Sequence, residues 1–396
     1  MRCLPFLLLL AACDPRGGDA RRTPPPTPVE DADVVEDAAA PPPVDLGPPA
    51  PDAAPFDVPE RITLAGYNVH NLFDLVDDPR TDEGEFTPGS QWNATDLALR
   101  VRDLARVFVA LDADVVAVVE IESEAALTTL RDAITTAGGP VYPWLAVSTT
   151  GDGRGIRLGV LSRLPLGQVG ARPVNRVHMC QGDEGPVTLD GSQPEARPIF
   201  QVELALGDTP AKRPILLINH WKARLESYPC VADEHRLRAA LQLRDVVDQL
   251  IAQAPDRPVV AMGDFNTFEF EAPIRNALGA VLDPALLERP GDLYNSWGDA
   301  GVQLFNANDN RRNNATNSSY AFRGDWTRLD HILLTANLEP DSGTAGWRRV
   351  PGSGGNIHND FLFDGRGYPL VWEMRGASGY SDHLPVHVVL EQRPDR

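Results

Sequence analysis

Eight short apolar runs, spread between residues 61 and 391, each end in or lead into polar residues. They lie at residues 61–69, 114–120, 155–165, 198–206, 213–220, 257–266, 328–335 and 384–391. Runs of this length are typical of buried β-strands. Residues 95–111 and 232–254 instead place apolar side chains at three- and four-residue spacing, with charges on the other face, which predicts two helices.

So many strands with long crossovers predict two packed sheets covered by helices. Residues 60–393 contain no Pro- or Gly-rich linker, so we expect them to form one domain. Within that domain the stretch 301–319 is polar and uncapped, and we expect a long surface loop there.

The N-terminus has a different pattern. Residues 1–12 combine Arg2 with the apolar run LPFLLLLAA, which is too short to span a bilayer and predicts a signal peptide for export. The sequence LAAC, ending at Cys13, resembles a bacterial lipobox, which implies cleavage before Cys13, lipidation of its thiol and anchoring to a bacterial membrane. The alternative is an ordinary signal peptide with a chance cysteine, and Asp14 leaves open which membrane is used.

Residues 13–59 begin with this cysteine and continue as a stretch of Pro, Ala and Asp with almost no aromatic residue. Such a segment cannot bury enough apolar surface to offset its ordering entropy, and its prolines favour an extended conformation. We expect a disordered spacer between the membrane and the folded domain.

The charge is strongly acidic. The formal net charge is −20, and residues 14–60 carry 11 Asp/Glu against 3 Arg, so most of the negative charge belongs to the rest of the chain. Tight, sequence-independent binding of nucleic acid normally rests on Lys and Arg. A phosphate substrate would therefore need metal ions as a source of positive charge.

The cysteines separate by position. Cys3 lies in the signal and Cys13 is the predicted lipid site, which leaves Cys180 and Cys230. An even pair in an exported chain is a disulfide candidate. Two free thiols are the alternative, because no spacing rule links them.

Polar residues lie at the ends of six of the predicted strands, either closing the strand or just before or inside its start. They are Asn68, Glu120, Asn219 with His220, Asp264 with Asn266, Asp330 with His331, and Asp382 with His383. Each alone has a structural explanation, such as a turn or a satisfied core histidine. Burying so many acids together without a basic partner is unfavourable unless a cation or catalysis requires them.

The order N…E…NH…GDFN…LDH…SDH resembles the endonuclease/exonuclease/phosphatase superfamily, with its deoxyribonuclease I-like fold. The two motifs GDFN and SDHLP, taken together, carry the resemblance. The resemblance extends over nearly all of residues 61–391. The resemblance implies an α/β fold: a four-layer α/β/β/α sandwich with two packed mixed sheets. YNVHNLFD and SSYAFRGDWTRLDHILLT look like segments of exported bacterial nuclease-type members.

Phosphate-ester hydrolysis needs an activated water, stabilisation of the phosphoryl oxygens and help for the leaving oxygen. Mg²⁺ prefers oxygen ligands, so Glu120 and Asn68, joined by Asp382, are the expected ligands of Mg²⁺, or of Mn²⁺ or Ca²⁺. Asp264 is then free to take a proton from water, with Asn266 fixing its orientation or that of the phosphate.

His220 and His383 are expected to donate hydrogen bonds to the phosphate. By resemblance to the Asp–His pair of the family, Asp330 is the carboxylate behind His383. Arg157 and Lys222 are further candidates for phosphate contacts, with a solvated surface role as the alternative for each.

The motif at His220 resembles the branch with deoxyribonuclease I-like nucleases, sphingomyelinases and inositol polyphosphate phosphatases. The first expectation is an exported, membrane-anchored nuclease, a metal-dependent phosphodiester hydrolase that acts on nucleic acid. The second is a secreted phosphodiesterase or phosphatase acting on lipid headgroups or small phosphoesters. A surface binding module that has lost catalysis is the third. No protein partner is implied, and we expect a monomer.

Overall fold

The computed structural model describes residues 56–79, 81–174, 180–182, 185–187, 197–224, 229–299, 318–322, 325–374 and 379–394. The predicted signal, the lipid site at Cys13 and most of the spacer lie outside these residues, as does nearly all of the predicted loop 301–319. At the start of the described part, the ring of Phe56 packs edge-on against Trp144.

The first sheet is mixed and has seven strands in the described part of the chain. Strand β1 (Arg61–Leu72) lies at its centre, parallel to β2 (Val115–Ile121) and antiparallel to β17 (Val386–Gln392). In spatial order the strands are β15 (Trp347–Arg349), β17 (Val386–Gln392), β1 (Arg61–Leu72), β2 (Val115–Ile121), β4 (Arg157–Ser162) and β3 (Trp144–Val147), with β16 (Gly355–Asn356) also paired to β17.

The second sheet is also mixed and has six strands in the described residues. Strand β10 (Val259–Asp264) runs parallel to β9 (Ile215–His220) and antiparallel to β14 (Asp330–Thr335). The order is β11 (Leu293–Asn295), β14 (Asp330–Thr335), β10 (Val259–Asp264), β9 (Ile215–His220), β8 (Ile199–Leu204) and β5 (Leu166–Arg172). Two short hairpins pair β12 (Tyr320–Phe322) with β13 (Asp325–Thr327) and β6 (Cys180–Gly182) with β7 (Gly185–Val187).

In the described residues, three α-helices cover the sheets. They are α1 (Ala94–Leu111), α2 (Glu124–Thr136) and α3 (Pro229–Gln253), accompanied by short helical turns at Gly84–Phe86, Pro210–Lys212, Pro273–Ala277, Pro284–Leu286, Ser296–Gly298, Ala336–Leu338 and Asp360–Leu362. Helix α1 starts where the Asn93 side chain accepts hydrogen bonds from two backbone N–H groups, and the Ser123 side chain caps α2 by accepting one from the backbone N–H of Ala126. Within the described residues, no helix is long and apolar enough to cross a membrane.

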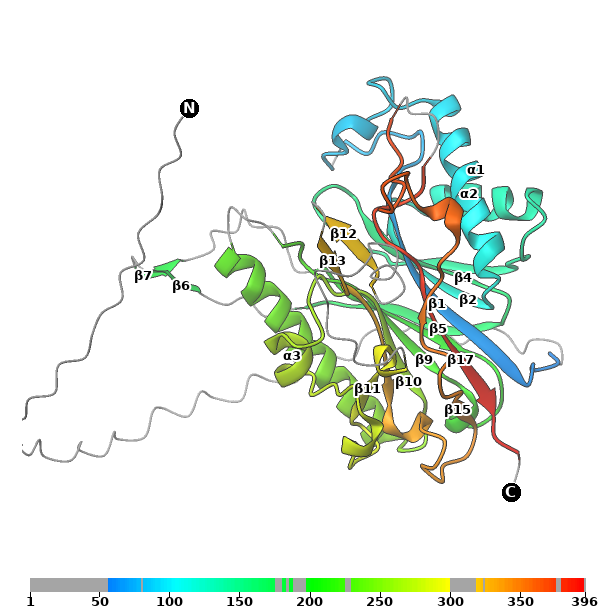
Figure 1. Cartoon of the computed structure of the whole chain (residues 1–396), viewed down its shortest axis with the longest axis vertical. Helices are drawn as coiled ribbons and strands as arrows, with labels where there is room; N and C mark the ends of the chain where they lie inside the picture. Colours follow the sequence, from blue (N-terminus) through cyan, green and yellow to red (C-terminus); the bar gives the residue numbers. More distant parts are fainter. Residues whose placement is uncertain are drawn as a thin grey trace, which may run out of the picture. The chain divides into compact units, whose positions relative to one another are not determined.

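Three buried apolar clusters separate four layers. On β1, Leu64 packs between the two sheets, whereas its neighbour Ala65 packs against the side of α1 and α2. On β10, Met262 packs between the sheets and Ala261 faces α3. This alternation follows from the two-residue period of a strand that is buried on both faces. Figure 1 shows α1 and α2 on one side of the strands and α3 on the other, so the predicted α/β/β/α sandwich is confirmed.

All eight predicted strands and both predicted helices are present. The ends differ by a few residues: the helix expected at 232–254 is Pro229–Gln253, and the strand expected to end at Val69 continues to Leu72. Helix α2, the edge strands β3, β5, β11, β15 and β16, and the short hairpins were not predicted.

Candidate active site

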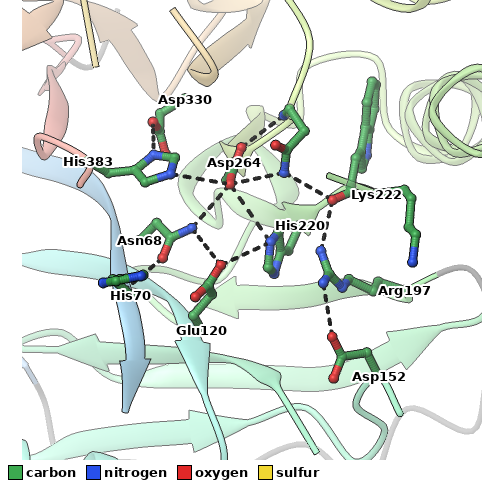
Figure 2. A network of polar contacts seen from close by, with 12 residues as sticks. Asn68, His70, Glu120, Asp152, Arg197, His220, Lys222, Asp264, Asp330 and His383 are labelled. Atoms are coloured by element: carbon green, nitrogen blue, oxygen red, sulfur yellow. Dashed lines mark hydrogen bonds and ion pairs between the residues drawn. The ribbon is translucent and has the colours of Figure 1, made fainter. Parts of the chain in front are cut away.

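The strand pairing gathers the predicted polar residues at one end of the sandwich. In the second sheet, His220 on β9 and Asp330 on β14 stand on either side of Asp264, the last residue of β10. From the first sheet, Asn68 on β1 and Glu120 on β2 reach the same cluster (Figure 2). Carboxyl ends of neighbouring parallel strands meet at one edge of a sheet, and here two such edges face each other.

Asp264 lies at the centre of the polar network. Its Oδ1 accepts from the backbone N–H of Asn266 at 2.8 Å, and its Oδ2 accepts from Nδ2 of Asn68 and Nδ2 of Asn266, each at 3.1 Å. Nε2 of His220 lies 3.7 Å and Nε2 of His383 lies 3.8 Å from the same Oδ2. The Asp264 carboxylate is therefore held by hydrogen bonds from Asn68 and Asn266, and both His220 and His383 lie close to its Oδ2.

Glu120 forms the second acidic position. Its Oε1 accepts from Nδ2 of Asn68 at 3.1 Å and lies 3.5 Å from Nε2 of His220, while Oε2 accepts from the Asn71 backbone N–H at 3.1 Å. The cap of the following helix α2 comes from Ser123 and does not use the Glu120 side chain. Glu120 instead points into the cluster (Figure 2).

His383 and Asp330 form the expected pair. Nδ1 of His383 donates to Oδ2 of Asp330 at 2.7 Å, which leaves Nε2 directed at Asp264. Asp382 lies at the rim, with its Oδ1 4.0 Å from Nε2 of His383. Ser381 donates to the carbonyl of Asn68 at 2.7 Å and so connects this segment to β1.

The backbone is unusual at several of these residues. Glu120 has a φ of +67° and Asn266 one of +48°, while His70 and Asn71 have φ of +53° and +62°. The β1–β2 register shifts between Asn68 and Leu72. A positive φ at a non-glycine residue costs about 1–3 kcal/mol, and such residues cluster at functional sites. Bulges of this kind re-aim side chains, which explains how Glu120 turns toward the cluster from within a strand.

The two histidines have opposite electrostatics although both are buried. Burial, together with the charges of Arg197 and the other histidine, lowers the pKa of His220 well below its ordinary value. Burial also acts to lower the pKa of His383, but the carboxylates of Asp330, Asp264 and Asp382 raise it well above its ordinary value. At neutral pH the site holds one neutral and one charged imidazole.

Burial raises the pKa of Asp264 above the usual carboxyl range. The charges of Asp330 and Glu120 act in the same direction, and His383 together with the backbone N–H of Asn266 opposes them. A carboxyl group with a raised pKa is a better proton acceptor once it is ionised, as general-base catalysis requires.

A group of basic residues lies beside His220; we call Arg154, Arg197 and Lys222 the basic flank. Arg197 donates to Oδ2 of Asp152 and to the carbonyl of Trp221, both at 2.9 Å. Burial and the charges of Arg197 and Arg154 lower the pKa of Lys222. Lys222 was predicted as a phosphate contact, whereas Arg154 and Arg197 were missed, because only the fold brings these distant residues together.

Two further residues near the cluster, Tyr320 and His331, were given no catalytic or binding role from the sequence. The ring of Tyr320 on β12 lies 4.7 Å from the ring of His383. His331, next to Asp330, is a core histidine: its Nε2 lies 2.8 Å from the carbonyl of Thr267 and its Nδ1 3.0 Å from the amide of Asn295. Its position inside the LDH motif thus has a structural explanation.

Three further residues predicted from the sequence are not seen in the cluster: Arg157 lies at the start of β4, and the side chains of Cys180 and Cys230 are outside the described part. Arg157 starts β4, where its backbone pairs with Ile121, and its charge acts on Glu122, whose pKa is raised mainly by burial. Its role as a phosphate contact stays a prediction. The side chains of Cys180 and Cys230 lie outside the described part, so the disulfide also stays a prediction.

The cluster meets the requirements of a divalent cation. Glu120, His220 and Asp264 each offer a ligand atom within 4.8 Å of one another, and so do Asp264, Asp330 and His383. Among the described residues, the ion-pair contacts of Glu120 and Asp264 are with histidines and not with Lys or Arg. Several clustered carboxylates whose neighbouring counter-charge is one protonated histidine suit an oxygen-preferring cation.

Asn68 needs one adjustment to serve as a ligand. Its Nδ2 faces Glu120 and Asp264, while its Oδ1 accepts from the backbone N–H of His70 at 2.9 Å. Coordination through the amide oxygen calls for the opposite orientation of this amide.

The α/β/β/α sandwich thus carries a cluster of His, Asp and Glu at one end. The chain belongs to the Endonuclease/Exonuclease/phosphatase family, whose sequence pattern matches residues 63–392, and this membership makes it a phosphoesterase, a hydrolase of ester bonds. The predicted family is therefore confirmed. The search of curated proteins found no match.

Several solved structures are similar in fold. They include a humanized TDP2 of D. rerio (14% identity, TM-score 0.49, covering 84% of this chain and 100% of that one). A mannosyl-6-phosphatase of Bacteroides thetaiotaomicron has 14% identity and a TM-score of 0.46, covering 83% and 99%. D. rerio TDP2 complexed with a single-strand DNA product has 14% identity and a TM-score of 0.45, covering 84% and 100%. At this level of similarity these structures do not select a substrate.

Proposed function

We propose that this chain is a metal-dependent phosphodiester hydrolase whose substrate is nucleic acid. The observation that carries the hydrolase proposal is the buried Asp264 carboxylate, held by two asparagines and placed between a neutral and a protonated histidine. Such a site provides a proton acceptor and a charged hydrogen-bond donor side by side.

In the proposed reaction, Asp264 takes the proton of the attacking water through Oδ2. Asn266 keeps the carboxylate in place with its backbone N–H and its amide. His383 donates from Nε2 to a phosphoryl oxygen, and Asp330 fixes the ring by accepting from Nδ1. His220 is proposed to donate a second hydrogen bond to the phosphate from the other side of Asp264.

The proposed ligands of the cation are Glu120 and Asn68, with Asp382 at the rim. When bound, Mg²⁺, Mn²⁺ or Ca²⁺ supplies positive charge to the phosphoryl and leaving oxygens. This supply matters here because the chain carries a net charge of −20 and its site is rich in carboxylates.

The basic flank favours a substrate with more than one phosphate. Arg154 is half exposed, Lys222 is partly buried, and both charges act on His220. A polynucleotide places further phosphates next to the cleaved one, and Lys and Arg beside the site would bind them. The second candidate is a phosphodiesterase or phosphatase acting on lipid headgroups or small phosphoesters, since the family includes more than one phosphoester class.

We also propose that the chain is exported and anchored to a bacterial membrane through a lipid on Cys13. The support is the sequence of residues 1–13 alone. In this proposal the Pro-rich spacer separates the hydrolase from the membrane, and Cys180 and Cys230 form a disulfide.

The test is to offer the full-length chain plasmid DNA, RNA, bis(p-nitrophenyl) phosphate and sphingomyelin, with Mg²⁺, Mn²⁺ or Ca²⁺ and with chelator. We expect metal-dependent nicking of DNA that Asp264→Ala and His383→Ala reduce by about 10²–10⁴-fold. Asp132→Asn, an exposed carboxylate on α2, is the matched control and should keep full activity.

The outcomes separate the proposals. Cleavage of sphingomyelin without cleavage of nucleic acid would favour the second candidate. No turnover of any phosphodiester or monoester would favour a binding module without catalysis. Activity that survives chelation would contradict the metal-dependent mechanism.

A further inference from the structure

Helix α1 buries an arginine on the face that packs against the first sheet. Arg100 has no exposed surface, and its guanidinium stacks over the ring of Trp372 at 5.2 Å. Burial lowers the pKa of Arg100 to about 10, so the side chain stays charged at neutral pH. A fully buried cation is costly unless its donors are satisfied, so its partners indicate its role.

The partners of Arg100 are backbone carbonyls of two different segments. Nη2 donates to the carbonyls of Val69 and His70, the latter at 3.1 Å, and Nη1 donates to the carbonyl of Tyr380. The first two carbonyls directly follow Asn68. The third directly precedes Ser381, Asp382 and His383.

Arg100 thus connects the two chain segments that deliver Asn68 and His383 to the site. Other contacts strengthen this junction: Asp103, one turn further along α1, accepts from the backbone N–H of Gly379 at 3.4 Å, and Ser381 bonds to the Asn68 carbonyl at 2.7 Å. We call Arg100 with its three carbonyl partners the carbonyl clamp. It contacts backbone groups on the helix side of the sheet, behind the cluster, and does not touch the reacting atoms.

We propose that Arg100 is a positioning residue for the phosphoester hydrolysis proposed above: through the carbonyl clamp it fixes the distance between the end of β1 and the Tyr380–His383 segment. The inference rests on the proposed function for its effect on catalysis, whereas the clamp itself can be tested without turnover.

Two physical arguments support this role. A guanidinium is a rigid planar fork that donates in fixed directions, so one side chain can set the relative position of three carbonyls. The β1 segment it holds includes His70 and Asn71, whose positive φ values are unfavourable for non-glycine residues and persist only when the surroundings impose them.

Lysine cannot replace this arrangement, because its single ammonium group lacks the fork. The test therefore compares Arg100→Lys and Arg100→Met in the full-length chain. The matched control is Arg349→Met: Arg349 is also buried and stacks over an aromatic ring, Tyr294 at 4.4 Å, but bonds to carboxylates of Asp299 and Glu339. Its strand, β15, pairs with the end of β17 remote from His383.

Turnover of bis(p-nitrophenyl) phosphate with Mg²⁺ is measured at a temperature at which circular dichroism shows all variants folded. Misplacing a catalytic group by about 1 Å can cost about 10²-fold, so we expect both Arg100 variants to lower kcat by about 10–100-fold. KM should change by less than about threefold, because the lost interaction acts on the transition state. Arg349→Met should keep kcat within about twofold of wild type.

Hydrogen–deuterium exchange is the second readout. We expect faster exchange at residues 69–72 and 380–384 in the Arg100 variants but not in Arg349→Met. An Arg100 variant that keeps both the wild-type kcat and the wild-type exchange would overturn the inference. Faster exchange with unchanged kcat would overturn the positioning role, and loss of kcat in Arg349→Met to the same degree would reduce the effect to general stability.

Inactivity of the wild-type chain on every phosphoester is a separate result, which contradicts the proposed function. The exchange comparison would then decide the carbonyl clamp alone: unchanged exchange in the Arg100 variants would overturn it too.

Discussion

At the residue scale, the site depends on side chains of the same type in different surroundings. His220 and His383 are both buried within 4 Å of Asp264, yet their pKa values move in opposite directions. The difference comes from the charged residues around each ring. The basic flank lies beside His220, whereas the Asp330 carboxylate accepts a hydrogen bond from His383. The Asp330–His383 pair therefore makes His383 a charged donor, while His220, which has no such carboxylate behind it among the described residues, is a neutral donor.

This arrangement predicts a bell-shaped pH dependence of kcat/KM. The rate should rise as Asp264 loses its proton, at a pH above the ordinary carboxyl pKa of about 4, because the pKa of Asp264 is raised. It should fall at higher pH, where His383 loses its proton, because the pKa of His383 is also raised.

Asp330→Asn tests the assignment of the second limb. The substitution removes the carboxylate that raises the pKa of His383 most, so the falling limb should move to lower pH, while Asp132→Asn should leave the profile unchanged. The measurement is kcat/KM across pH 4–10 with a soluble diester. A falling limb that stays in place in Asp330→Asn would contradict the role of His383.

At the element scale, the pairing of β9 with β10 explains the glycine of GDFN. Gly263 has a φ of +127°, and a Cβ at this position would lie 2.1 Å from the carbonyl oxygen of Asn219 on β9. A side chain would therefore separate the two strands that carry His220 and Asp264. The motif needs glycine for close strand approach as much as it needs its acid.

Gly263→Ala should lower the free energy of unfolding by about 3 kcal/mol or more, because it combines a clash with backbone and an unfavourable φ. Gly365→Ala is the control: no atom lies within 4 Å of its Cβ position, so its effect should stay within about 0.5 kcal/mol. Urea unfolding followed by fluorescence measures both. A Gly263→Ala protein as stable as the control would show that β9 and β10 can separate at this position.

Elements with a strong pattern could be predicted from the sequence, and those without one could not. The central strands are continuous apolar runs, whereas β5 (LGQVGAR) is mostly half-buried and β12 and β13 span three residues each. Arg100 lies in a predicted helix, but its role depends on Tyr380, 280 residues away. The same holds for Arg197 and Asp152, which are 45 residues apart in sequence and joined only by the fold.

At the scale of the whole molecule, the folded part and the N-terminal segment follow different physics. The described residues between 56 and 394 form layers held by three apolar clusters, whereas the composition of residues 14–59, rich in Pro, Ala and Asp, predicts no core. The proposed location depends entirely on the short sequence that ends at Cys13.

Cys13→Ser should release the protein from the membrane fraction, because the thiol is the proposed site of lipidation. Cys3→Ser is the matched control, since Cys3 lies in the segment predicted to be removed, and this variant should stay with the membrane. Fractionation of expressing bacteria followed by immunoblotting measures both. Membrane retention of Cys13→Ser would contradict the lipid anchor.

The meeting of two sheets at the site has a consequence for how activity is acquired. Asn68 and Glu120 lie in the first sheet and His383 lies just before its strand β17, while His220, Asp264 and Asp330 come from the second. Neither half of the sandwich contains a complete reaction centre. During refolding from denaturant, turnover should therefore return after secondary structure, because it requires the two sheets to be packed together.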